Sequence, residues 1–321
     1  MHPVSTVTVT VPATTANLGP GFDCIGAALT LYNQFKFTRL EADAATLLSI
    51  TVEGIEAARV NTGADNLVYQ SFVKLYEHIG KTPPPVQIEI ELGVPLARGL
   101  GSSATAIVGG LVGANCLAGA PLDENEVRRI AIALEGHPDN VVPALLGGCR
   151  LAATGLIDEP HRHGERKEEW AICEIPWHSE IVPVVAIPEF ELSTEEARRV
   201  LPTQYSRADA IFNTAHLGLL LRGLETGRGD WLRVAMQDRI HQPYRTALIR
   251  GYDAVRSAAM ASGAFGMVIS GAGPTLLALA EAALAPTVVE AMAAAWKDEG
   301  IMAQVRSLSI DTHGAKTFNI S

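Results

Sequence analysis

The sequence contains no uninterrupted apolar stretch of the roughly 18 residues that a membrane span needs, although 48% of its 321 residues are hydrophobic. The first residues, Met1–Thr6, form no basic segment and no apolar block follows them, so no signal peptide is expected. Basic residues number 25 against 35 acidic ones and form no long cluster. Because nucleic acid is bound through clustered Lys and Arg, this composition excludes it as a partner. We expect a cytoplasmic protein without a membrane partner.

Cysteine is also scarce. The four cysteines, Cys24, Cys116, Cys149 and Cys173, are widely spaced and form no Cys-x-x-Cys motif. This spacing argues against a zinc site and against a disulfide scaffold. We expect reduced, mostly buried thiols. The length of 321 residues favours two domains.

A glycine-rich segment, Pro-Leu-Ala-Arg-Gly-Leu-Gly-Ser-Ser-Ala from Pro95 to Ala104, is the most informative part of the sequence. It follows an alternating apolar run over 86–92, which predicts a strand. It precedes a run of small apolar residues over 106–117, which predicts a buried helix. The segment therefore connects a strand to the start of a helix.

The composition of this segment predicts an anion-binding site. Gly99 and Gly101 allow the backbone to approach a ligand, and Ser102 and Ser103 add hydroxyls beside helical N–H groups that lack an internal partner. The segment does not match the P-loop, because that pattern ends in Gly-Lys-Ser/Thr and no lysine is present here. A plain turn with a serine helix cap is the alternative.

The rest of the chain alternates between predicted strands and helices. Valines alternating with threonines predict a strand over Thr6–Val11 that ends at Pro12. The crowded charges over 158–170 predict a solvated hairpin tip or a link between domains. Further strands are predicted over 34–40, 47–52 and 181–188, and helices over 67–79 and 122–134.

Two polar groups in the first half could carry chemistry. Asn17 and Asp23 flank a loop of glycines and prolines, where they could bind a ligand or only form an Asx turn. Four polar residues follow the helix predicted over 122–134, where a carboxylate could hold Mg²⁺ and the others a polar substrate. One of them, the aspartate, could instead cap the next helix. The four are Glu135, His137, Asp139 and Asn140.

The second half contributes two further groups. Residues 193–198 have the pattern of a capping box that begins a helix, and this pattern leaves Thr194 and Arg198 one turn apart and able to point the same way. Arg239, His241 and Arg245 form the other group. Arginine forks suit a carboxylate or a phosphate, although surface arginines are also common.

Three ordered motifs resemble those of the GHMP kinases, the family named for galactokinase, homoserine kinase, mevalonate kinase and phosphomevalonate kinase. They are residues 11–23, the glycine-rich segment extended to Thr105, and Gly-Ala-Gly-Pro-Thr at 271–275. The extended segment, residues 95–105, is the cradle. The run Asn-Leu-Gly-Pro-Gly-Phe-Asp, together with residues 137–140 and 242–245, is most similar to the homoserine kinase branch. The resemblance covers nearly the whole chain.

The resemblance implies an α+β fold of two domains with the site between them. Residues 1–165 would form an ATP-binding domain like domain 2 of ribosomal protein S5, and residues 166–321 a ferredoxin-like domain that contributes to the substrate site. The implied activity is ATP-dependent phosphorylation of L-homoserine in threonine biosynthesis, by a chain that could form a homodimer. Another small-molecule kinase of the mevalonate pathway and a ligand sensor without turnover are the alternatives.

The resemblance also assigns residues. Asp23, His137, Thr194 and Arg198 would be catalytic. The substrate would contact Asn17, Asp23, His137, Asn140, Arg198 and Arg245, with Thr194 lining the same pocket. Mg²⁺ would be held by Glu135 and a serine of the cradle, Ser102 or Ser103, with Ser103 assigned. The ATP phosphates would contact Pro95, Leu96, Ala97, Arg98, Gly99, Leu100, Gly101, Ser102, Ser103, Ala104 and Thr105.

Overall fold

The structure is a computed structural model that describes residues 5–41, 47–158 and 166–320. Its larger sheet has the strand order β11-β1-β2-β4-β3, and β5 pairs with β2 and with β6. All neighbours are antiparallel except β3 and β4, which are parallel. The strands are β1 (Thr6–Ala16), β2 (Ile25–Arg39), β3 (Leu48–Gly54), β4 (Val86–Leu92), β5 (Cys149–Asp158), β6 (Arg166–Ile175) and β11 (Lys316–Ile320).

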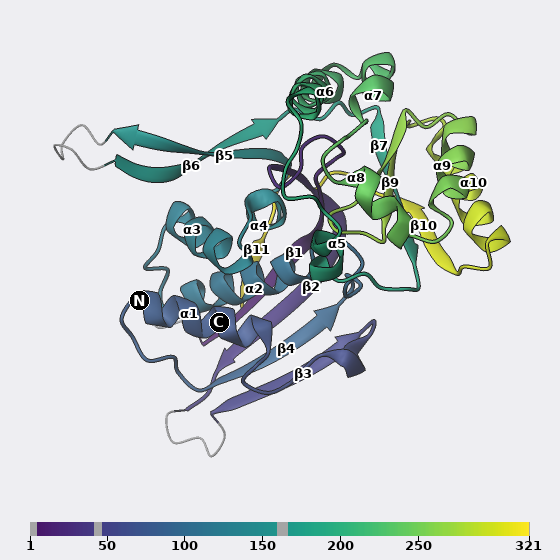
Figure 1. Ribbon diagram of the computed structural model, residues 1–321. Helices are drawn as coiled ribbons and strands as arrows, with labels where there is room; N and C mark the ends of the chain where they lie inside the picture. Colours follow the sequence, from purple (N-terminus) through teal and green to yellow (C-terminus); the bar gives the residue numbers. More distant parts are fainter. Residues whose placement is uncertain (1–4, 42–46, 159–165, 321) are drawn as a thin grey trace.

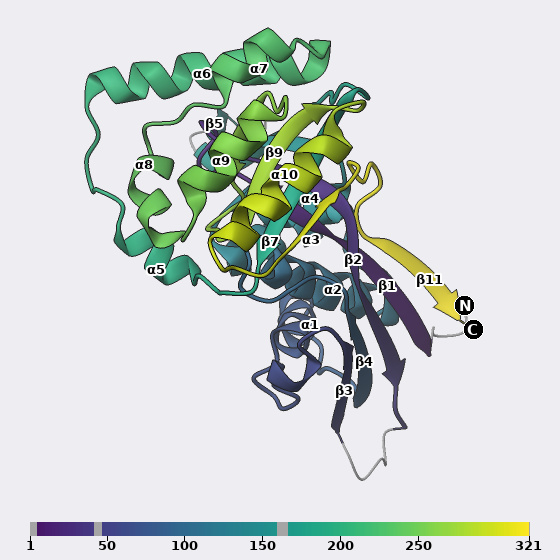
Figure 2. The ribbon, with the colours of Figure 1, turned by 90° about the vertical axis from the view of Figure 1, so that its right-hand side faces the viewer.

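Four helices cover one face of this sheet (Figures 1 and 2). They are α1 (Leu67–His78), α2 (Ser102–Leu117), α3 (Glu124–Glu135) and α4 (Pro138–Leu146). The alternating apolar residues of β2 point into this layer, where the fully buried rings of Phe37 and Phe72 stack. The predicted helices over 67–79, 106–117 and 122–134 and the predicted strands over 34–40 and 47–52 are thus confirmed.

The prediction that Pro12 ends the first strand is wrong. β1 continues to Ala16, because its register with β2 shifts between Pro12 and Ala13. An irregularity of this kind accommodates a proline, which has no backbone N–H to donate to the neighbouring strand. The longer strand leads directly into the loop that carries Asn17 and Asp23.

The smaller sheet has the order β10-β7-β9-β8. Its strands are β7 (Ile181–Pro188), β8 (Gly266–Ile269), β9 (Leu276–Glu281) and β10 (Ala303–Ser307). Helices α9 (Tyr252–Ala261) and α10 (Ala285–Asp298) pack on it, with Trp296 fully buried (Figure 2). The other α-helices of the described residues are α5 (Thr194–Arg199), α6 (Arg207–Thr226), α7 (Gly229–Ala235) and α8 (Gln242–Arg245).

One hydrophobic cluster joins the two sheets. It contains Ala27 and Leu29 of β2, Val185 of β7, and the fully buried Leu220 and Leu232 of α6 and α7. Burial of apolar side chains is the main stabilising contribution to such an interface. The two sheets are therefore held at a fixed distance, and the loops at their junction are positioned by both.

β5 and β6 form a hairpin that projects from the molecule (Figure 1). β5 and β6 pair antiparallel, with Cys149 opposite Ile175 and Asp158 opposite Arg166. Residues 159–165, in the middle of the charged segment 158–170 that was predicted to be a hairpin tip or a link between domains, lie outside the described residues. The predicted domain boundary after residue 165 falls there too. β6 and β11 both belong to the larger sheet. The division of the chain into two domains stays a prediction.

The structure also bears on two expectations from composition. Within the described residues, no helix has both the length and the apolar character to cross a membrane. The four cysteines are free, as expected. Cys149 is buried, whereas Cys173 on the projecting hairpin is exposed, so the expectation of mostly buried thiols is wrong for Cys173.

Glycines on α2 allow close helix packing, and this can be tested at Gly110. A Cβ added there would lie 2.3 Å from the backbone oxygen of Val68 in α1, so the two helices would have to separate. We expect Gly110→Ala to lower the free energy of unfolding by about 1–3 kcal/mol, measured by denaturant titration.

The matched control is Gly218→Ala on the exposed face of α6. A Cβ added at Gly218 meets nothing within 4 Å, so the same substitution should raise the free energy of unfolding by about 0.5–1 kcal/mol. If both variants changed the free energy of unfolding in the same direction, the close approach of α1 and α2 would not be the reason for a glycine at position 110.

Candidate active site

Three glycine-rich segments meet where the two sheets join. The backbone N–H of Thr14 donates to the carbonyl of Leu100 at 3.1 Å, which connects β1 to the cradle. The N–H of Gly271 donates to the carbonyl of Ala16 at 3.1 Å. The Ser270 hydroxyl donates to the carbonyl of Gly99 at 2.6 Å. The three motifs therefore form one hydrogen-bonded unit.

Two features of the cradle require glycine at positions 99 and 101: the backbone conformation of its turn and the close approach of the neighbouring segments. The φ angles of Gly99 and Gly101 are +74° and +67°, in the left-handed region that favours glycine. A Cβ on Gly99 would lie 2.3 Å from the backbone oxygen of Ser270, and one on Gly101 would lie 1.9 Å from Oγ1 of Thr14. The turn places Ser102 and Ser103 at the start of α2, a helix of 16 residues whose first N–H groups have no helical partner.

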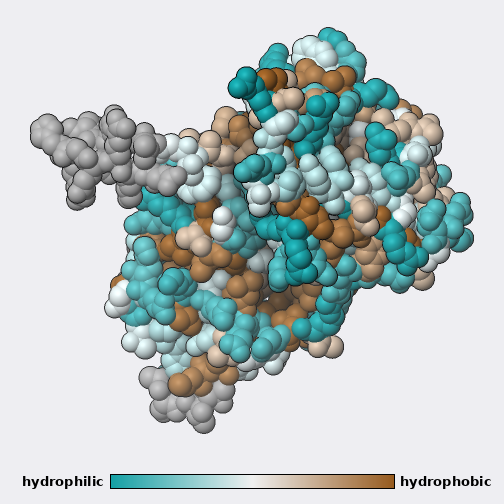
Figure 3. All heavy atoms as spheres, viewed as in Figure 1, coloured by the Kyte–Doolittle hydropathy of each residue, from teal (hydrophilic) through white to brown (hydrophobic). Residues whose placement is uncertain are grey.

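A cavity of about 330 Å³ opens at this helix start. On this face of the molecule the surface beside α5 is hollowed (Figure 3). The cavity is lined by every residue assigned to catalysis, to the substrate or to the metal. These are Asn17, Asp23, Ser103, Glu135, His137, Asn140, Thr194, Arg198 and Arg245.

Ser103 and Glu135 form an oxygen pair at one end of the cavity. The Ser103 hydroxyl donates to Oε2 of Glu135 at 2.9 Å. Burial raises the pKa of Glu135, although the Ser103 hydrogen bond opposes that rise. Among the described residues, no group of three or more His, Cys, Asp or Glu side chains could hold a metal. A metal here would need ligands from a bound molecule in addition to this pair.

Asp23 and Arg198 form a bidentate ion pair across the cavity. Nη1 of Arg198 donates to Oδ2 of Asp23 at 3.0 Å, and Nη2 donates to Oδ1 at 2.8 Å. The hydrogen bonds from Arg198 to Asp23 raise the pKa of Arg198. The predicted capping box begins α5, because Oγ of Ser193 accepts the N–H of Glu196, and this fixes the helix that carries Arg198.

His137 and Asp139 form a second pair. Nδ1 of His137 lies 2.5 Å from Oδ1 of Asp139, whose side chain is 3% exposed. Burial disfavours the charged imidazole, but the hydrogen bond and the negative charge of Asp139 outweigh it, so the pKa of His137 is raised. Asp139 thus orients the imidazole that lines the cavity, in addition to its place in the first turn of α4.

The Asx-turn alternative holds for Asn17 in part. Oδ1 of Asn17 accepts the backbone N–H of Asp23 at 3.0 Å, and Nδ2 donates to the carbonyl of Gly271 at 2.9 Å. Asn140 also has an internal partner, because its Oδ1 accepts the Thr14 hydroxyl at 2.7 Å. Both side chains line the cavity while they connect its walls.

Not every residue of the cradle faces this cavity. Leu100, Ala104 and Thr105 are 0% exposed, and the Thr105 hydroxyl donates to the carbonyl of Ser102. Leu96 and Pro95 line other hollows. The cradle therefore mixes residues that reach the cavity with residues that support it.

Arg98 lines the cavity, but its guanidinium is engaged by protein atoms. Nε donates to the carbonyl of Pro188 at 3.0 Å, and Nη2 donates to that of Glu189 at 2.6 Å and to Oε1 of Glu56 at 3.2 Å. The side chain is 7% exposed. Arg98 thus connects the cradle to the end of β7.

A second cavity of about 320 Å³ was not predicted from the sequence. It shares Ala97, Ser102 and Ser103 with the first cavity, and it continues between α1 and β4 to Leu67 and Ile90. These apolar residues follow ordinary core patterns, so the sequence carried no signal for them. Arg239, predicted to form one polar group with Arg245, lies instead over the ring of Phe212, 4.0 Å from its centroid, and lines neither cavity.

Comparisons with known proteins identify the family. The family model described as GHMP kinases N terminal domain matches residues 66–148, and the one described as GHMP kinases C terminal matches residues 220–298. The homoserine kinase of Trichormus variabilis is 69% identical over 315 residues, covering 98% of this chain and 100% of that protein. The chain belongs to the GHMP kinase family. The homoserine kinase of Nostoc punctiforme is 68% identical over 318 residues, covering 99% of this chain and 100% of that protein.

Solved GHMP kinase structures share the fold. The crystal structure of homoserine kinase from Cytophaga hutchinsonii superposes with a TM-score of 0.84 at 28% identity, covering 98% of both chains. Mevalonate kinase from L. major has a TM-score of 0.66 at 15% identity and covers 94% of this chain and 95% of its own, which shows the fold alone. The α+β GHMP kinase fold expected from the motifs is confirmed.

The pairing of His137 with Asp139 generates a prediction about pH. In Asp139→Asn the imidazole loses its charged partner, so the pKa of His137 should fall, as measured by an NMR titration of the ring protons. In the original protein, the raised pKa of His137 adds to the free energy of unfolding, and this contribution is fully present below the pKa of the unfolded state. It should be lost as the pH rises through the pKa of His137 in the folded state. The exposed Asp298→Asn is the control, and an unchanged titration in Asp139→Asn would contradict the pairing.

Proposed function

We propose that this chain transfers the γ-phosphoryl group of ATP to the hydroxyl of L-homoserine, giving O-phospho-L-homoserine for threonine biosynthesis. One observation carries the proposal: a single cavity contains a helix start suited to phosphate, the carboxylate of Asp23, and the guanidinium groups of Arg198 and Arg245. Homoserine has an ammonium, a carboxylate and a hydroxyl, which are the complementary groups. The relatives with 55–69% identity are named homoserine kinase.

The phosphate chain of ATP would lie along the cradle. The first N–H groups of α2 and the positive end of its helix dipole face the cavity, and both favour bound anions. The cavity beyond Ser102 and Ser103, lined by Leu67 and Ile90, would take the nucleoside, since its apolar walls suit a base. The γ-phosphate would then lie at the junction of the two cavities.

The residues present fit a Mg²⁺ ion bound together with ATP. Ser103 and Glu135 offer a hydroxyl and a carboxylate oxygen 2.9 Å apart, and Mg²⁺ prefers oxygen ligands shared between a few side chains and phosphates. When bound, the ion neutralises charge on the β- and γ-phosphates. We place it at this pair.

Asp23, Arg198 and Arg245 would hold the amino acid. Asp23 and Arg198 satisfy one another in the structure, and a substrate placed between them would give the carboxylate of Asp23 an ammonium and the guanidinium of Arg198 a carboxylate. Nδ1 of His137 is engaged by Asp139, so its other ring nitrogen would face the hydroxyl. Phosphoryl transfer depends mainly on positioning and charge stabilisation, so a strong base is not required.

The rival functions would leave parts of this site unused. Mevalonate has no ammonium group, so Asp23 would have no ligand partner in a mevalonate kinase. A sensor without turnover has no need of the pair formed by Ser103 and Glu135. The cytoplasmic location and the homodimer stay predictions from the sequence.

The first experiment measures ADP release from Mg-ATP with L-homoserine, L-serine, mevalonate and galactose as acceptors. We expect turnover with L-homoserine alone, and loss of that turnover when Mg²⁺ is chelated. Turnover with mevalonate would overturn the assignment of the amino-acid site. Binding of ATP and L-homoserine without ADP release would support the sensor.

The role of Asp23 is tested by Asp23→Asn, which removes the negative charge and keeps the shape. We expect the KM for L-homoserine to rise by about 10-fold or more, because a hydrogen bond to a charged group is worth about 1.5–3 kcal/mol, while the KM for ATP stays within about twofold. The same substitution at Asp230, which pairs with Arg228 on the surface, should change neither. Equal effects of Asp23→Asn on both substrates would exclude this role.

A further inference from the structure

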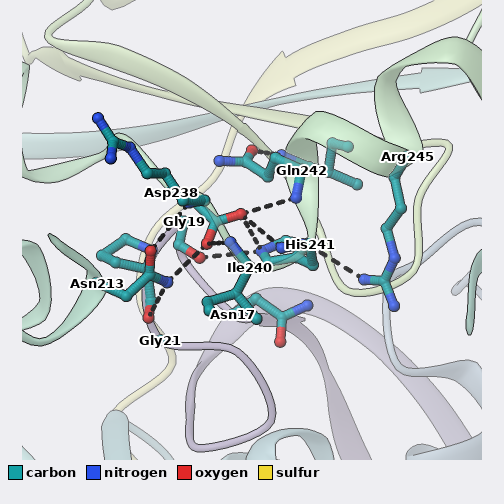
Figure 4. Close-up of polar contacts among 12 residues, drawn as sticks. Asn17, Gly19, Gly21, Asn213, Asp238, Ile240, His241, Gln242 and Arg245 are labelled. Atoms are coloured by element: carbon teal, nitrogen blue, oxygen red, sulfur yellow. Dashed lines mark hydrogen bonds and ion pairs between the residues drawn. The ribbon is translucent and has the colours of Figure 1, made fainter. Parts of the chain in front are cut away.

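Residues from the C-terminal half hold the loop that carries Asn17 and Asp23 in place (Figure 4). The centre of this network is the carboxylate of Asp238, whose side chain is 0% exposed. Its Oδ2 accepts the backbone N–H groups of His241 at 2.9 Å and Gln242 at 2.7 Å. Its Oδ1 accepts Nδ2 of Asn213 at 2.7 Å. Asp238 therefore fixes the backbone where α8 begins.

His241, held in this way, contacts both the loop and Arg245. Its Nε2 lies 2.9 Å from the carbonyl oxygen of Gly19, and its Nδ1 lies 3.3 Å from Nη1 of Arg245. Because a carbonyl only accepts and a guanidinium only donates, Nε2 carries the proton and Nδ1 presents its lone pair to Arg245. Burial lowers the pKa of His241 to about 4, although the charge of Asp238 opposes that fall. The imidazole is thus neutral, as this arrangement requires.

The guanidinium of Arg245 is restrained on several sides. Its Nε donates to the carbonyl of Ala197 at 3.0 Å, and Nη1 donates to that of Gly271 at 3.1 Å. Phe22 lies against it, with the ring centroid 5.1 Å from Cζ of Arg245, and the same ring stacks on the imidazole of His241 at 5.1 Å. Arg245 is 2% exposed and yet lines the cavity. Among the described residues its Nη2 has no hydrogen-bond partner, which leaves this nitrogen for a ligand.

We propose that His241 is a positioning residue: its neutral imidazole receives Nη1 of Arg245, keeps Nη2 directed at the substrate carboxylate, and connects Arg245 to the loop that carries Asp23. This inference rests on the proposed function, because the carboxylate is that of homoserine. It predicts that His241 acts on the affinity for the amino acid, through Arg245, without contacting substrate itself.

Two substitutions separate the two contacts of His241. The side-chain amide of His241→Asn reaches the position of Nδ1, so it can still accept from Arg245 but loses Gly19. The amide of His241→Gln reaches the position of Nε2, so it can still donate to Gly19 but loses the acceptor for Arg245. Each variant therefore keeps one of the two contacts of His241 and loses the other.

The measurements are KM and kcat for L-homoserine, KM for ATP, and kcat/KM for 3-aminopropan-1-ol. This last acceptor has the hydroxyl and the ammonium of homoserine but no carboxylate. We expect His241→Gln to raise the KM for L-homoserine about 10-fold, with kcat and the KM for ATP within about twofold. It should leave kcat/KM for 3-aminopropan-1-ol unchanged. His241→Asn should stay within about threefold of the original protein for L-homoserine.

A matched control and a second variant keep the test decisive. His178→Gln alters a histidine that lies outside the cavity, where it accepts the N–H of Glu180, and it should change none of these values. If His241→Gln does not fold, Phe22→Leu removes the ring that holds the imidazole of His241 beside Arg245. The same ring lies 5.6 Å from Cζ of Arg198, the other arginine assigned to the carboxylate. Phe22→Leu should raise the KM for L-homoserine several-fold and leave 3-aminopropan-1-ol unaffected.

The outcomes distinguish this inference from the function on which it rests. Equal KM values for L-homoserine in His241→Gln and the original protein would overturn the positioning role and leave the kinase assignment intact. Parallel losses for both acceptors would also overturn it, because the carboxylate would then not be the group affected. If the unaltered protein does not use L-homoserine, both proposals fail.

Discussion

The site depends on the hydrogen bonds that join three glycine-rich segments distant in sequence. Backbone groups of Thr14, Leu100 and Gly271, with the hydroxyl of Ser270, connect β1, the cradle and the turn between β8 and β9. This close approach requires a glycine at position 101, because any side chain there would collide with Thr14. Since buried backbone groups must be paired, these hydrogen bonds fix the three segments relative to one another and so shape the cavity.

Within the cavity, four charged or titratable groups form two pairs. Asp23 pairs with Arg198, and His137 pairs with Asp139. Such pairing avoids the cost of isolated charges in a partly buried site and keeps each side chain in one position. A ligand with an ammonium and a carboxylate can exchange contacts with Asp23 and Arg198 without leaving either charge unpaired.

Much of the fold follows from local patterns that the sequence displays openly. The helices over 67–79 and 122–134 have regular apolar spacing, and the second begins at an Asp123 capping box. Local patterns failed where tertiary contacts decided the outcome. β1 continues past Pro12 because the neighbouring strand accommodates a register shift, and Arg239 leaves the polar group predicted for it because its guanidinium packs on Phe212.

The sequence by itself determined the family, the glycine-rich turn and the set of polar residues that line the first cavity, because motif chemistry and spacing are local properties. Only the tertiary structure decided which partner each group has. It paired Asp23 with Arg198, turned the guanidinium of Arg98 toward the end of β7, and placed His241 between Gly19 and Arg245. Those contacts join residues up to 222 positions apart in the sequence. The packing of the two sheets brings such residues together, and no local sequence pattern encodes that packing.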